Sequence, residues 1–388
     1  MIFNRSIEYL KEKNAWATAR EIAQQPSTWK KTFLQIQEDY QAKKLASRYV
    51  NNPQAFIVFT GAGSSEFVGN ALVPLLRTSI AAQVASIATT DLLTDVSTHL
   101  KKDTPTLLVS FGRSGNSPES IGAVEVAQNH CRHIDHLFIT CNSKGTLAGM
   151  QLTMNNVTSV LLSEETHDES FAMTSSFSNM FLAAALLFLP DALSVSIDPL
   201  SDGVEHFLAS GYRTIENAVD HFEFDRIVYL GSGHLKGIAQ ESALKILELT
   251  AGKVASLYDT FLGFRHGPKS FLSPSTLTVM YLSPLPKVRR YELDLLKEMS
   301  AQSDIGKILL VDTMEDELVA SMANDILVYP YLSSSHLAYT ALSSIVVAQT
   351  IGLFKSLSEG KTPDNPFPSG SVNRVVQGVT LYLKEEEV

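Results

Sequence analysis

Short apolar runs alternate with helical patterns along most of this chain. The first series of runs is rich in β-branched and other apolar residues and covers residues 55–60, 84–89, 106–110, 136–141 and 158–163. Strand-like runs separated by helical segments are typical of a parallel sheet that is covered by helices on both faces. The pattern therefore predicts an α/β fold.

A second series of five strand-like runs follows downstream. These runs lie at residues 226–230, 254–258, 276–282, 307–312 and 325–329. The residues recur as well as the pattern, because IVFTGAG at 57–63 parallels IVYLGSG at 227–233, and VASI at 84–87 parallels VASL at 254–257. We therefore predict two similar α/β halves, each with a five-stranded sheet.

The two halves are preceded by a helical segment. Ser27 and Thr28 precede Trp29 and spaced apolar positions, as a helix cap would, and nothing in this region suggests catalysis. We expect it to be a packing or oligomerisation arm.

Each of the two halves ends with an apolar helix, at 178–189 and at 340–354. The expected domains are an N-terminal helical segment at 1–48, a first α/β domain at 49–200, and a second, with the C-terminal tail, at 201–388.

Composition narrows the class of protein. The chain of 388 residues has a net charge of −10 and no basic tract, which argues against a nucleic-acid partner. Its two cysteines, Cys131 and Cys141, form no disulfide framework and suggest a reducing compartment. The N-terminus has no signal-peptide core, and the longest apolar runs are too short or too interrupted to span a bilayer. We expect a cytoplasmic protein with no membrane partner.

Two loops after neighbouring strands have the composition of an anion site. Residues 110–117 (SFGRSGNS) lie between a strand and a predicted helix N-terminus, where free backbone N–H groups, the helix dipole and serine hydroxyls favour a phosphate. Residues 61–65 (GAGSS) follow the first strand in the same way. Glu66 stands where a dinucleotide motif needs its third glycine, so a single phosphate fits better. The alternative is two tight turns without a ligand.

A third candidate combines two carboxylates with a lysine. Glu241, Lys245 and Glu248 are spaced by four and three residues and would share one face of a helix. A carboxylate beside a charged neighbour can serve as a tuned general base. Taken alone, the spacing favours the simpler interpretation, a solvated ion pair on a surface helix.

Other polar clusters are weaker candidates. His266 lies in the loop 263–269 (GFRHGPK) and is equally compatible with a proton shuttle and with an ordinary loop histidine. The segment 164–176, which includes Thr174, is either a substrate wall or a polar loop that caps the next helix. Histidines and a cysteine at 130–136 match no tetrahedral ligand spacing, so we expect no metal.

These motifs resemble those of tandem sugar isomerase (SIS) domain proteins. The paired α/β halves, the SGxS loop, the ALKxxE helix and the RHGP loop carry the resemblance, which spans nearly the whole chain. Relatives include the isomerase half of glucosamine-6-phosphate synthase. The closer match is the galactosamine-6-phosphate deaminase/isomerase family, also described as tagatose-6-phosphate ketose/aldose isomerase.

The resemblance implies a role for each matched residue. Glu248 matches the isomerisation base, Lys245 its neighbouring lysine, and His266 the histidine of sugar ring opening, which in the synthase comes from the adjacent subunit. A homodimer with shared sites and no cofactor is thus implied. The residues expected to bind the phosphorylated substrate are Ser64, Ser65, Arg113, Ser114, Ser117, Thr174 and Glu241.

The chain also departs from the synthase pattern. The catalytic lysine near the C-terminus of the synthase aligns with Val376-Gln377-Gly378, and Arg374 is only a possible substitute. Arg113 replaces a glutamine, which adds a charge-assisted phosphate contact. After the strand at 276–282, the second half reads SPLP and lacks a phosphate loop of its own.

We therefore expect isomerisation and deamination of an amino sugar phosphate, with galactosamine 6-phosphate favoured as substrate. Three alternatives remain: a ketose/aldose isomerase that releases no ammonia, a fructosamine-phosphate deglycase, and a non-catalytic sugar-phosphate sensor. The sensor would need only the serine loops, so the presence of Glu248 and His266 argues against it.

Overall fold

Ten strands form two parallel five-stranded sheets in the computed structural model, which describes residues 1–189, 191–332, 335–376 and 378–383. The first sheet contains β1 (Phe56–Thr60), β2 (Gln83–Ser86), β3 (Thr106–Gly112), β4 (Ile134–Thr140) and β5 (Val157–Leu161). The second contains β6 (Arg226–Gly231), β7 (Ala255–Asp259), β8 (Thr276–Tyr281), β9 (Lys307–Asp312) and β10 (Asp325–Val328). The predicted fold class and the internal repeat are confirmed.

The two sheets have equivalent topologies. Their strand orders are β2-β1-β3-β4-β5 and β10-β9-β8-β6-β7, so β6 corresponds to β1 and β8 to β3. The registers agree as well, since Ile57 pairs with Leu107 and Ile227 with Leu277. In each sheet the chain reverses its direction of winding between the first and third strands, and the crevice at such a point is where open α/β sheets bind ligands.

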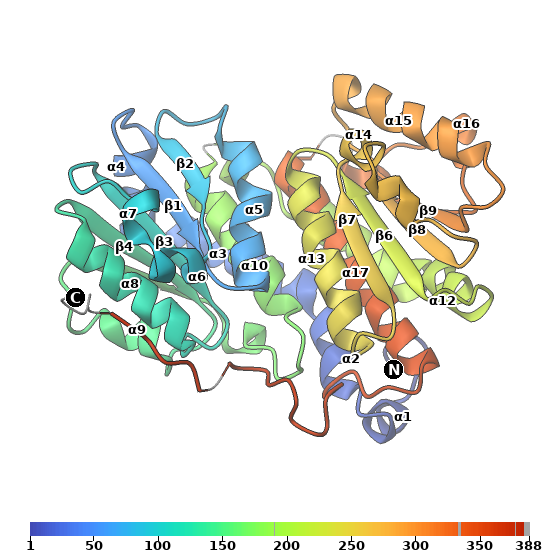
Figure 1. Cartoon of the computed structure of the whole chain (residues 1–388), viewed down its shortest axis with the longest axis horizontal. Coiled ribbons are helices and arrows are strands. Elements are labelled where there is room, and N and C mark those ends of the chain that lie inside the picture. Colours follow the sequence, from blue (N-terminus) through green and yellow to red (C-terminus); the bar gives the residue numbers. More distant parts are fainter. Residues whose placement is uncertain (190, 333–334, 377, 384–388) are drawn as a thin grey trace. The chain divides into compact units, whose positions relative to one another are not determined.

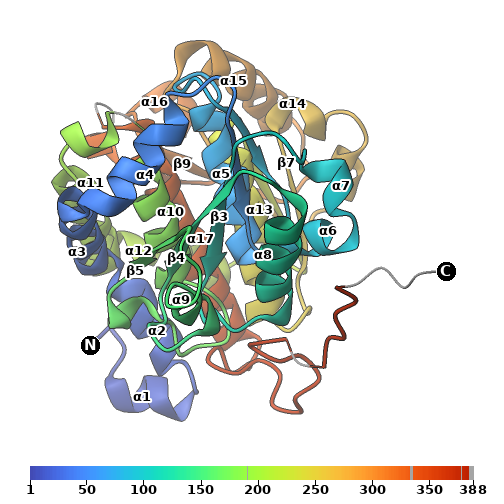
Figure 2. The same ribbon diagram turned by 90° about the vertical axis from the view of Figure 1, so that its left-hand side faces the viewer.

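Helices cover both faces of the first sheet (Figure 2). One face carries α4 (Tyr40–Val50), α5 (Ser64–Leu76) and α10 (Ser175–Phe188). The other carries α6 (Thr89–Thr94), α7 (Val96–His99), α8 (Pro118–His130) and α9 (Thr146–Met150), with Val58, Leu108 and Phe138 in the core beneath them. Because both faces are buried, the central strands β1 and β3 are mostly apolar rather than alternating.

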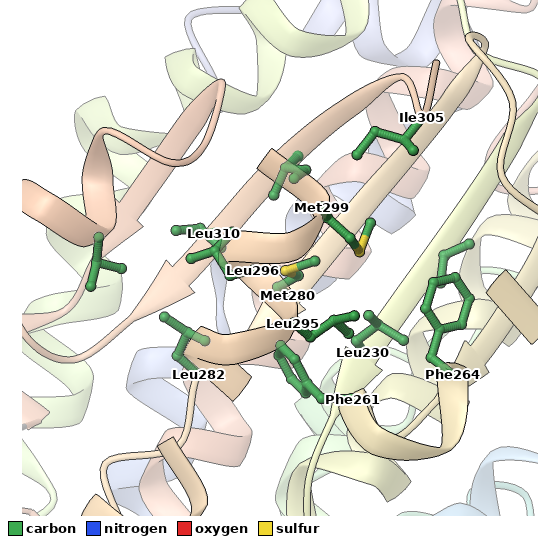
Figure 3. Close-up of a cluster of buried hydrophobic side chains, with 13 residues drawn as sticks. Leu230, Phe261, Phe264, Met280, Leu282, Leu295, Leu296, Met299, Ile305 and Leu310 are labelled. Atoms are coloured by element: carbon green, nitrogen blue, oxygen red, sulfur yellow. The ribbon is translucent and has the colours of Figure 1, made fainter. Parts of the chain in front are cut away.

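The second sheet is covered in the same manner (Figure 1). On one face lie α11 (Asp198–His206), the π-helical turn at Phe207–Gly211, α12 (Tyr212–Asp220), α13 (His234–Leu249) and α17 (Leu337–Ser358). On the other lie α14 (Phe261–Phe264), α15 (Pro286–Ser300) and α16 (Glu317–Ala320). Figure 3 shows the apolar core under α15, where Leu295, Leu296 and Met299 meet Leu230, Met280 and Leu310 of the strands.

The compact units of the chain do not follow the order of the sequence. A first-sheet unit comprises Thr28–His167, Ser175–Ser194 and the chain from Gly370; a second-sheet unit comprises Met1–Ser27, Asp168–Thr174 and Val195–Ser369. Within the second-sheet unit α1 (Ile7–Glu12) contacts α2 (Trp16–Ala23), and α2 contacts α17. Within the first-sheet unit Trp29 of α3 (Gln25–Glu38) donates to the Ser178 hydroxyl of α10 at 2.9 Å. N-terminal residues thus contribute to both units.

Two local expectations, for the start of one helix and for the length of the longest apolar helix, differ from the structure. Helix α3 begins at Gln25, so Ser27 and Thr28 lie in its first turn rather than before it; the Ser27 hydroxyl donates to the Gln24 carbonyl. The tail at 371–376 and 378–383 contains no helix or strand. Helix α17 has the length and composition of a membrane span, but 94% of that window is buried inside the described structure, as in a core helix.

Candidate functional site

Glycines bring the serines of the first-sheet unit to the end of β1. A Cβ on Gly61 would lie 2.4 Å from the Ser65 carbonyl carbon, so only glycine allows the helix α5 to start this close to the strand. Gly63 has a φ of +57°, in the region that favours glycine. Ser64 and Ser65 follow at the start of α5 and are both largely buried. Their backbone N–H groups belong to a helix N-terminus, the part of a helix that favours anions.

The loop after β3 is held in place by its neighbours. The Ser114 carbonyl accepts from the Asn142 side chain at 2.8 Å, and the Asn116 side chain accepts from the Thr146 backbone N–H at 2.9 Å. The Ser117 hydroxyl donates to Glu119 at 2.8 Å. Because β1 and β3 are adjacent and parallel, this loop and the Ser64–Ser65 turn leave the same edge of the sheet. The arrangement is suited to an anion, and the substrate-binding roles of these serines stay predictions.

Arg113 has a structural contact that the sequence did not suggest. Its side chain is 7% exposed and donates from Nη2 to the carbonyl oxygen of Arg374, at 3.0 Å. Both residues belong to the first-sheet unit. Arg113 therefore anchors the C-terminal tail beside the loop after β3, and its expected contact with a phosphate stays a prediction.

The carboxylate–lysine cluster of α13 is buried, so the interpretation as a solvated surface pair is wrong. The Lys245 ammonium lies 3.2 Å from Glu241 and 2.5 Å from Glu248. Lys245 and Glu241 have no exposed side-chain surface, whereas the Glu248 side chain is 24% exposed. The i+4 and i+3 spacing brought these residues onto one face as predicted, but spacing could not indicate that this face is covered by the rest of the fold.

Burial and charge act against each other at Lys245. Burial disfavours the ammonium, but the carboxylates of Glu241 and Glu248 outweigh this effect, and the pKa of Lys245 is raised. The Lys245 ammonium donates to the Glu248 carboxylate and so holds it in one orientation. Glu248 is thus the solvent-accessible member of an otherwise buried cluster, which suits a residue that takes a proton from a substrate.

The loop that carries His266 is fixed to α15 on both sides of the histidine. Arg265 donates from Nε to Glu298 at 2.9 Å and from Nη2 to Asp294 at 3.1 Å, and Lys269 also pairs with Glu298. The hydrogen bond from Lys269 is the largest of the effects that lower the pKa of Glu298. Between these anchors, His266 is exposed. The exposure is compatible with either role considered for this histidine.

Thr174 lies in the second-sheet unit, as do the α13 cluster and His266. Its side chain is fully buried, its backbone N–H donates to Asp168 at 2.7 Å, and its carbonyl accepts from Gln349 of α17 at 3.3 Å. The predicted site residues are therefore divided: Thr174, Glu241, Lys245, Glu248 and His266 are in the second-sheet unit, and the serines and Arg113 are in the first-sheet unit.

After β8, which corresponds to β3, the second half has no hydroxyl-rich loop, and the buried carboxylate of Glu292 lies there instead. The Ser283 backbone N–H, just after β8, donates to the buried Glu292 carboxylate at 2.7 Å. Next to it, Arg289 forms a buried bidentate pair with Asp312, at 2.8 and 2.6 Å. Burial raises the pKa of Glu292 to about 7. Sequence reasoning missed this network, whose only signal is polar residues at core-facing positions of α15.

No group of three or more histidine, cysteine or acidic side chains suited to a metal occurs among the residues that the structure describes. Two histidines of the 130–136 cluster have other partners: His130 bonds to the Leu100 carbonyl at 2.9 Å, and His136 to Gln128 at 3.0 Å.

Comparison with known proteins gives a consistent result. Residues 53–190 match the SIS domain family. The chain is 39% identical over 369 residues to the D-galactosamine-6-phosphate deaminase AgaS of Escherichia coli O157:H7, covering 94% of this chain and 95% of that protein. The crystal structure of tagatose-6-phosphate ketose/aldose isomerase from Escherichia coli is 36% identical, with a TM-score of 0.86 and coverage of 94% and 96%.

A second crystal structure is similar over almost the entire length of both chains. It is a Clostridium novyi NT protein, provisionally assigned as a tagatose-6-phosphate ketose/aldose isomerase. It is 41% identical, with a TM-score of 0.93 and coverage of 98% of this chain and 99% of that one.

The buried cluster on α13 generates a stability prediction. Lys245→Met removes the cation and leaves Glu241 buried without its counter-charge, so we expect a loss of about 3–5 kcal/mol in the free energy of unfolding at pH 8. Adding Glu241→Gln to this variant should restore part of the lost free energy of unfolding, because the unpaired buried charge is then removed. Urea unfolding measures the change. Lys236→Met, an exposed lysine on the same helix, should change stability by less than about 0.5 kcal/mol. Equal effects of the two lysine substitutions would show that Lys245 is not the buried counter-charge of Glu241.

The anchoring of the His266 loop generates a prediction about its mobility. Glu298→Gln weakens both anchors, so the backbone amides of residues 265–271 should exchange with deuterium a few-fold faster, as measured by mass spectrometry. Because these pairs are exposed to solvent, high salt should accelerate exchange in the unmodified protein more than in the variant. Lys297→Gln, an exposed neighbour on α15, serves as the control. Unchanged exchange in Glu298→Gln would show that the ion pairs do not hold the loop.

Proposed function

The chain belongs to the AgaS family of D-galactosamine-6-phosphate deaminases, and on this premise we propose that it converts galactosamine 6-phosphate and water to tagatose 6-phosphate and ammonia. The structural observation that carries the proposal is the buried Glu241–Lys245–Glu248 cluster, with Glu248 partly exposed. A catalytic base must be held in one orientation and must also be reachable by the substrate. The buried Lys245 beneath the partly exposed Glu248 meets both needs, and an ion pair with only a structural role needs neither.

The phosphate of the substrate binds to the glycine–serine turns of the first-sheet unit. Ser64, Ser65, Ser114 and Ser117 supply hydroxyls and backbone donors, and Arg113 adds positive charge beside them. Binding the phosphate, which does not react, holds carbons 1 and 2 of the sugar in position for chemistry. The hydrogen-bonded frame of the loop after β3 supports this role because it keeps the donors preorganised.

The reaction begins with opening of the sugar ring. His266 moves the proton of the carbon-1 hydroxyl to the ring oxygen, which gives the open-chain aldehyde. Glu248 then removes the proton from carbon 2 and an enolamine forms. A proton is returned at carbon 1, which leaves a ketimine at carbon 2. Water adds to the ketimine carbon and ammonia leaves, so that the ketose phosphate is the product. No step requires a metal or an organic cofactor.

The second candidate is a ketose/aldose isomerase that releases no ammonia, and the names of the two similar solved structures favour it. Both reactions use the same proton transfer between carbons 1 and 2. They differ in whether the carbon-2 substituent is an amine that can leave.

Incubation with galactosamine 6-phosphate separates these activities. We expect ammonia and tagatose 6-phosphate in equal amounts. Exchange of the carbon-2 proton with D₂O without ammonia would leave the isomerase, and absence of both signals would refute the proposed substrate. Glu248→Gln should abolish the exchange and still bind the substrate phosphate, because the amide cannot act as a base. Glu223→Gln, an exposed residue of the same unit, is the matched control.

We further propose that the protein acts as a homodimer in which His266 serves the site of the neighbouring subunit. The exposure of His266 supports this proposal. Subunits carrying Glu248→Gln and His266→Asn, each inactive alone, should recover a quarter to a half of the activity when they are mixed and refolded together. No recovery, with mixed dimers shown by native mass spectrometry, would place both residues on one subunit.

A further inference from the structure

The loop Asp168–Thr174 is held by three separate elements of the second-sheet unit. The carboxylate of Asp364, in the segment after α17, accepts from the backbone N–H groups of Ala17 and Thr18 at the start of α2, at 3.0 and 2.7 Å. The carbonyl of the same residue accepts from the Phe171 N–H at 3.1 Å. Helix α17 contributes Gln349, which donates to the Thr174 carbonyl. The third element is α2 itself.

Helix α2 contributes one fully buried acidic side chain, Glu21. Its Oε1 accepts from the backbone N–H groups of Glu169 and Ser170, at 2.6 and 3.2 Å. Its Oε2 also accepts from the Ser170 backbone N–H, at 3.4 Å, and lies in hydrogen-bond contact with the Ser170 hydroxyl. One carboxyl group therefore holds the centre of the loop by two backbone donors and one side chain.

The contacts of the Ser170 hydroxyl bear on the protonation state of Glu21. This hydroxyl contacts both Glu21 Oε2 and the carbonyl oxygen of Ala172, the latter at 3.1 Å. A serine hydroxyl has one proton, so it can make a full-strength hydrogen bond to only one of these two oxygens. The contacts are satisfied together when Glu21 is protonated: its O–H donates to Ser170 Oγ, and Ser170 donates to the Ala172 carbonyl.

We propose that Glu21 is a neutral carboxylic acid that positions the substrate loop Asp168–Thr174. It accepts two backbone N–H groups through Oε1 and donates a proton to Ser170 through Oε2. It is a positioning residue, because it acts through the loop that carries Thr174. The effect on catalysis rests on the proposed function; the protonation state does not.

The ionisable groups around Glu21 support its neutral state. Burial, followed by the charge of Asp168, raises the pKa of Glu21 to about 8. Asp168 is fully buried and Glu169 belongs to the same loop. Arg20 pairs with Glu21 Oε1 at 3.5 Å and with Glu169 at 3.2 Å, and its side chain is partly exposed. Asp364 adds a further negative charge at the start of α2. Because Arg20 is partly solvated and shared between two carboxylates, its charge offsets only part of the effect of burial on Glu21.

The proposal predicts how pH acts on the loop. The folded-state pKa lies above the ordinary value of 4.5, so the stabilisation by the proton is complete below pH 4.5 and is lost as the pH rises through about 8. Above pH 8 two buried carboxylates face each other, and Ser170 again has two acceptors for one proton. The loop should then loosen, and KM should rise while kcat changes less.

The experiment compares Glu21→Gln with Glu21→Ala from pH 6 to 10. A glutamine side chain reproduces the neutral acid, since its oxygen can accept the two backbone N–H groups and its amide can donate to Ser170. We expect Glu21→Gln to keep KM within about twofold of the unmodified enzyme at pH 7 and to lose the alkaline rise in KM. Glu21→Ala should raise KM about tenfold at every pH, since it removes hydrogen bonds of about 1.4 kcal/mol in total, a factor of ten. Glu169→Gln is the control, because Glu169 donates its backbone N–H to Glu21 but its own carboxylate is largely exposed. This variant should keep the alkaline rise in KM.

Thermal unfolding over the same pH range tests the protonation state without an activity assay. The unmodified protein should lose several degrees of Tm between pH 7 and 9 relative to Glu21→Gln. If Glu21→Gln behaves like Glu21→Ala in Tm or KM, the site requires a carboxylate and the proposal is wrong. A parallel alkaline decline of Tm in Glu21→Gln and the unmodified protein would also overturn it. If Glu21→Ala does not fold, the Gln variant and Glu169→Gln still decide between these outcomes.

Discussion

Both sheets are buried on both faces by helices, and this constraint determines where polar chemistry can occur. A side chain in the middle of such a strand is covered by helices, so ligand-binding groups lie at strand ends and on the helices that follow them. The turns after β1 and β6 illustrate the constraint. Each has glycines at the same positions, Gly61 and Gly63 in one and Gly231 and Gly233 in the other, because a helix must start directly at the end of a strand.

The two halves use this shared frame for different purposes. In the first half, the turn and loop at the switch point place serines at the starts of α5 and α8. In the second half, the equivalent space contains the buried Glu292 carboxylate, which accepts from the Ser283 backbone N–H, and beside it the Arg289–Asp312 pair. The duplicated fold thus has a serine-rich loop in one copy and a group of buried charged side chains at the equivalent place in the other. The Glu241–Lys245–Glu248 cluster of the second half lies instead on α13, the helix that follows β6.

Much of the fold could be predicted from the sequence, because parallel strands and buried helices have strong apolar patterns. Strand β9 was predicted to the residue, and the others within a few residues. The start of α3 was missed because Pro26 and Ser27 suit a first helical turn as well as a cap. The burial of Lys245 could not be predicted, since spacing defines a face of a helix but not what covers it. Glu21 was missed for a related reason: its partners, Ser170 and Asp168, are almost 150 residues away in the sequence.

The contact between Asp364 and α2 also has a consequence for the order in which the protein is made. The two ends of this contact, Ala17 and Asp364, are separated by 347 residues. At a synthesis rate of about 5–20 residues per second, α2 waits roughly 20 to 70 seconds for the residue that caps it. The second-sheet unit therefore cannot be completed while the chain is growing, although its first helices are the first to be synthesised. The first-sheet strands, β1 to β5, are close together in sequence and can pair during this interval, so that the nascent chain has one sheet formed before the other is closed.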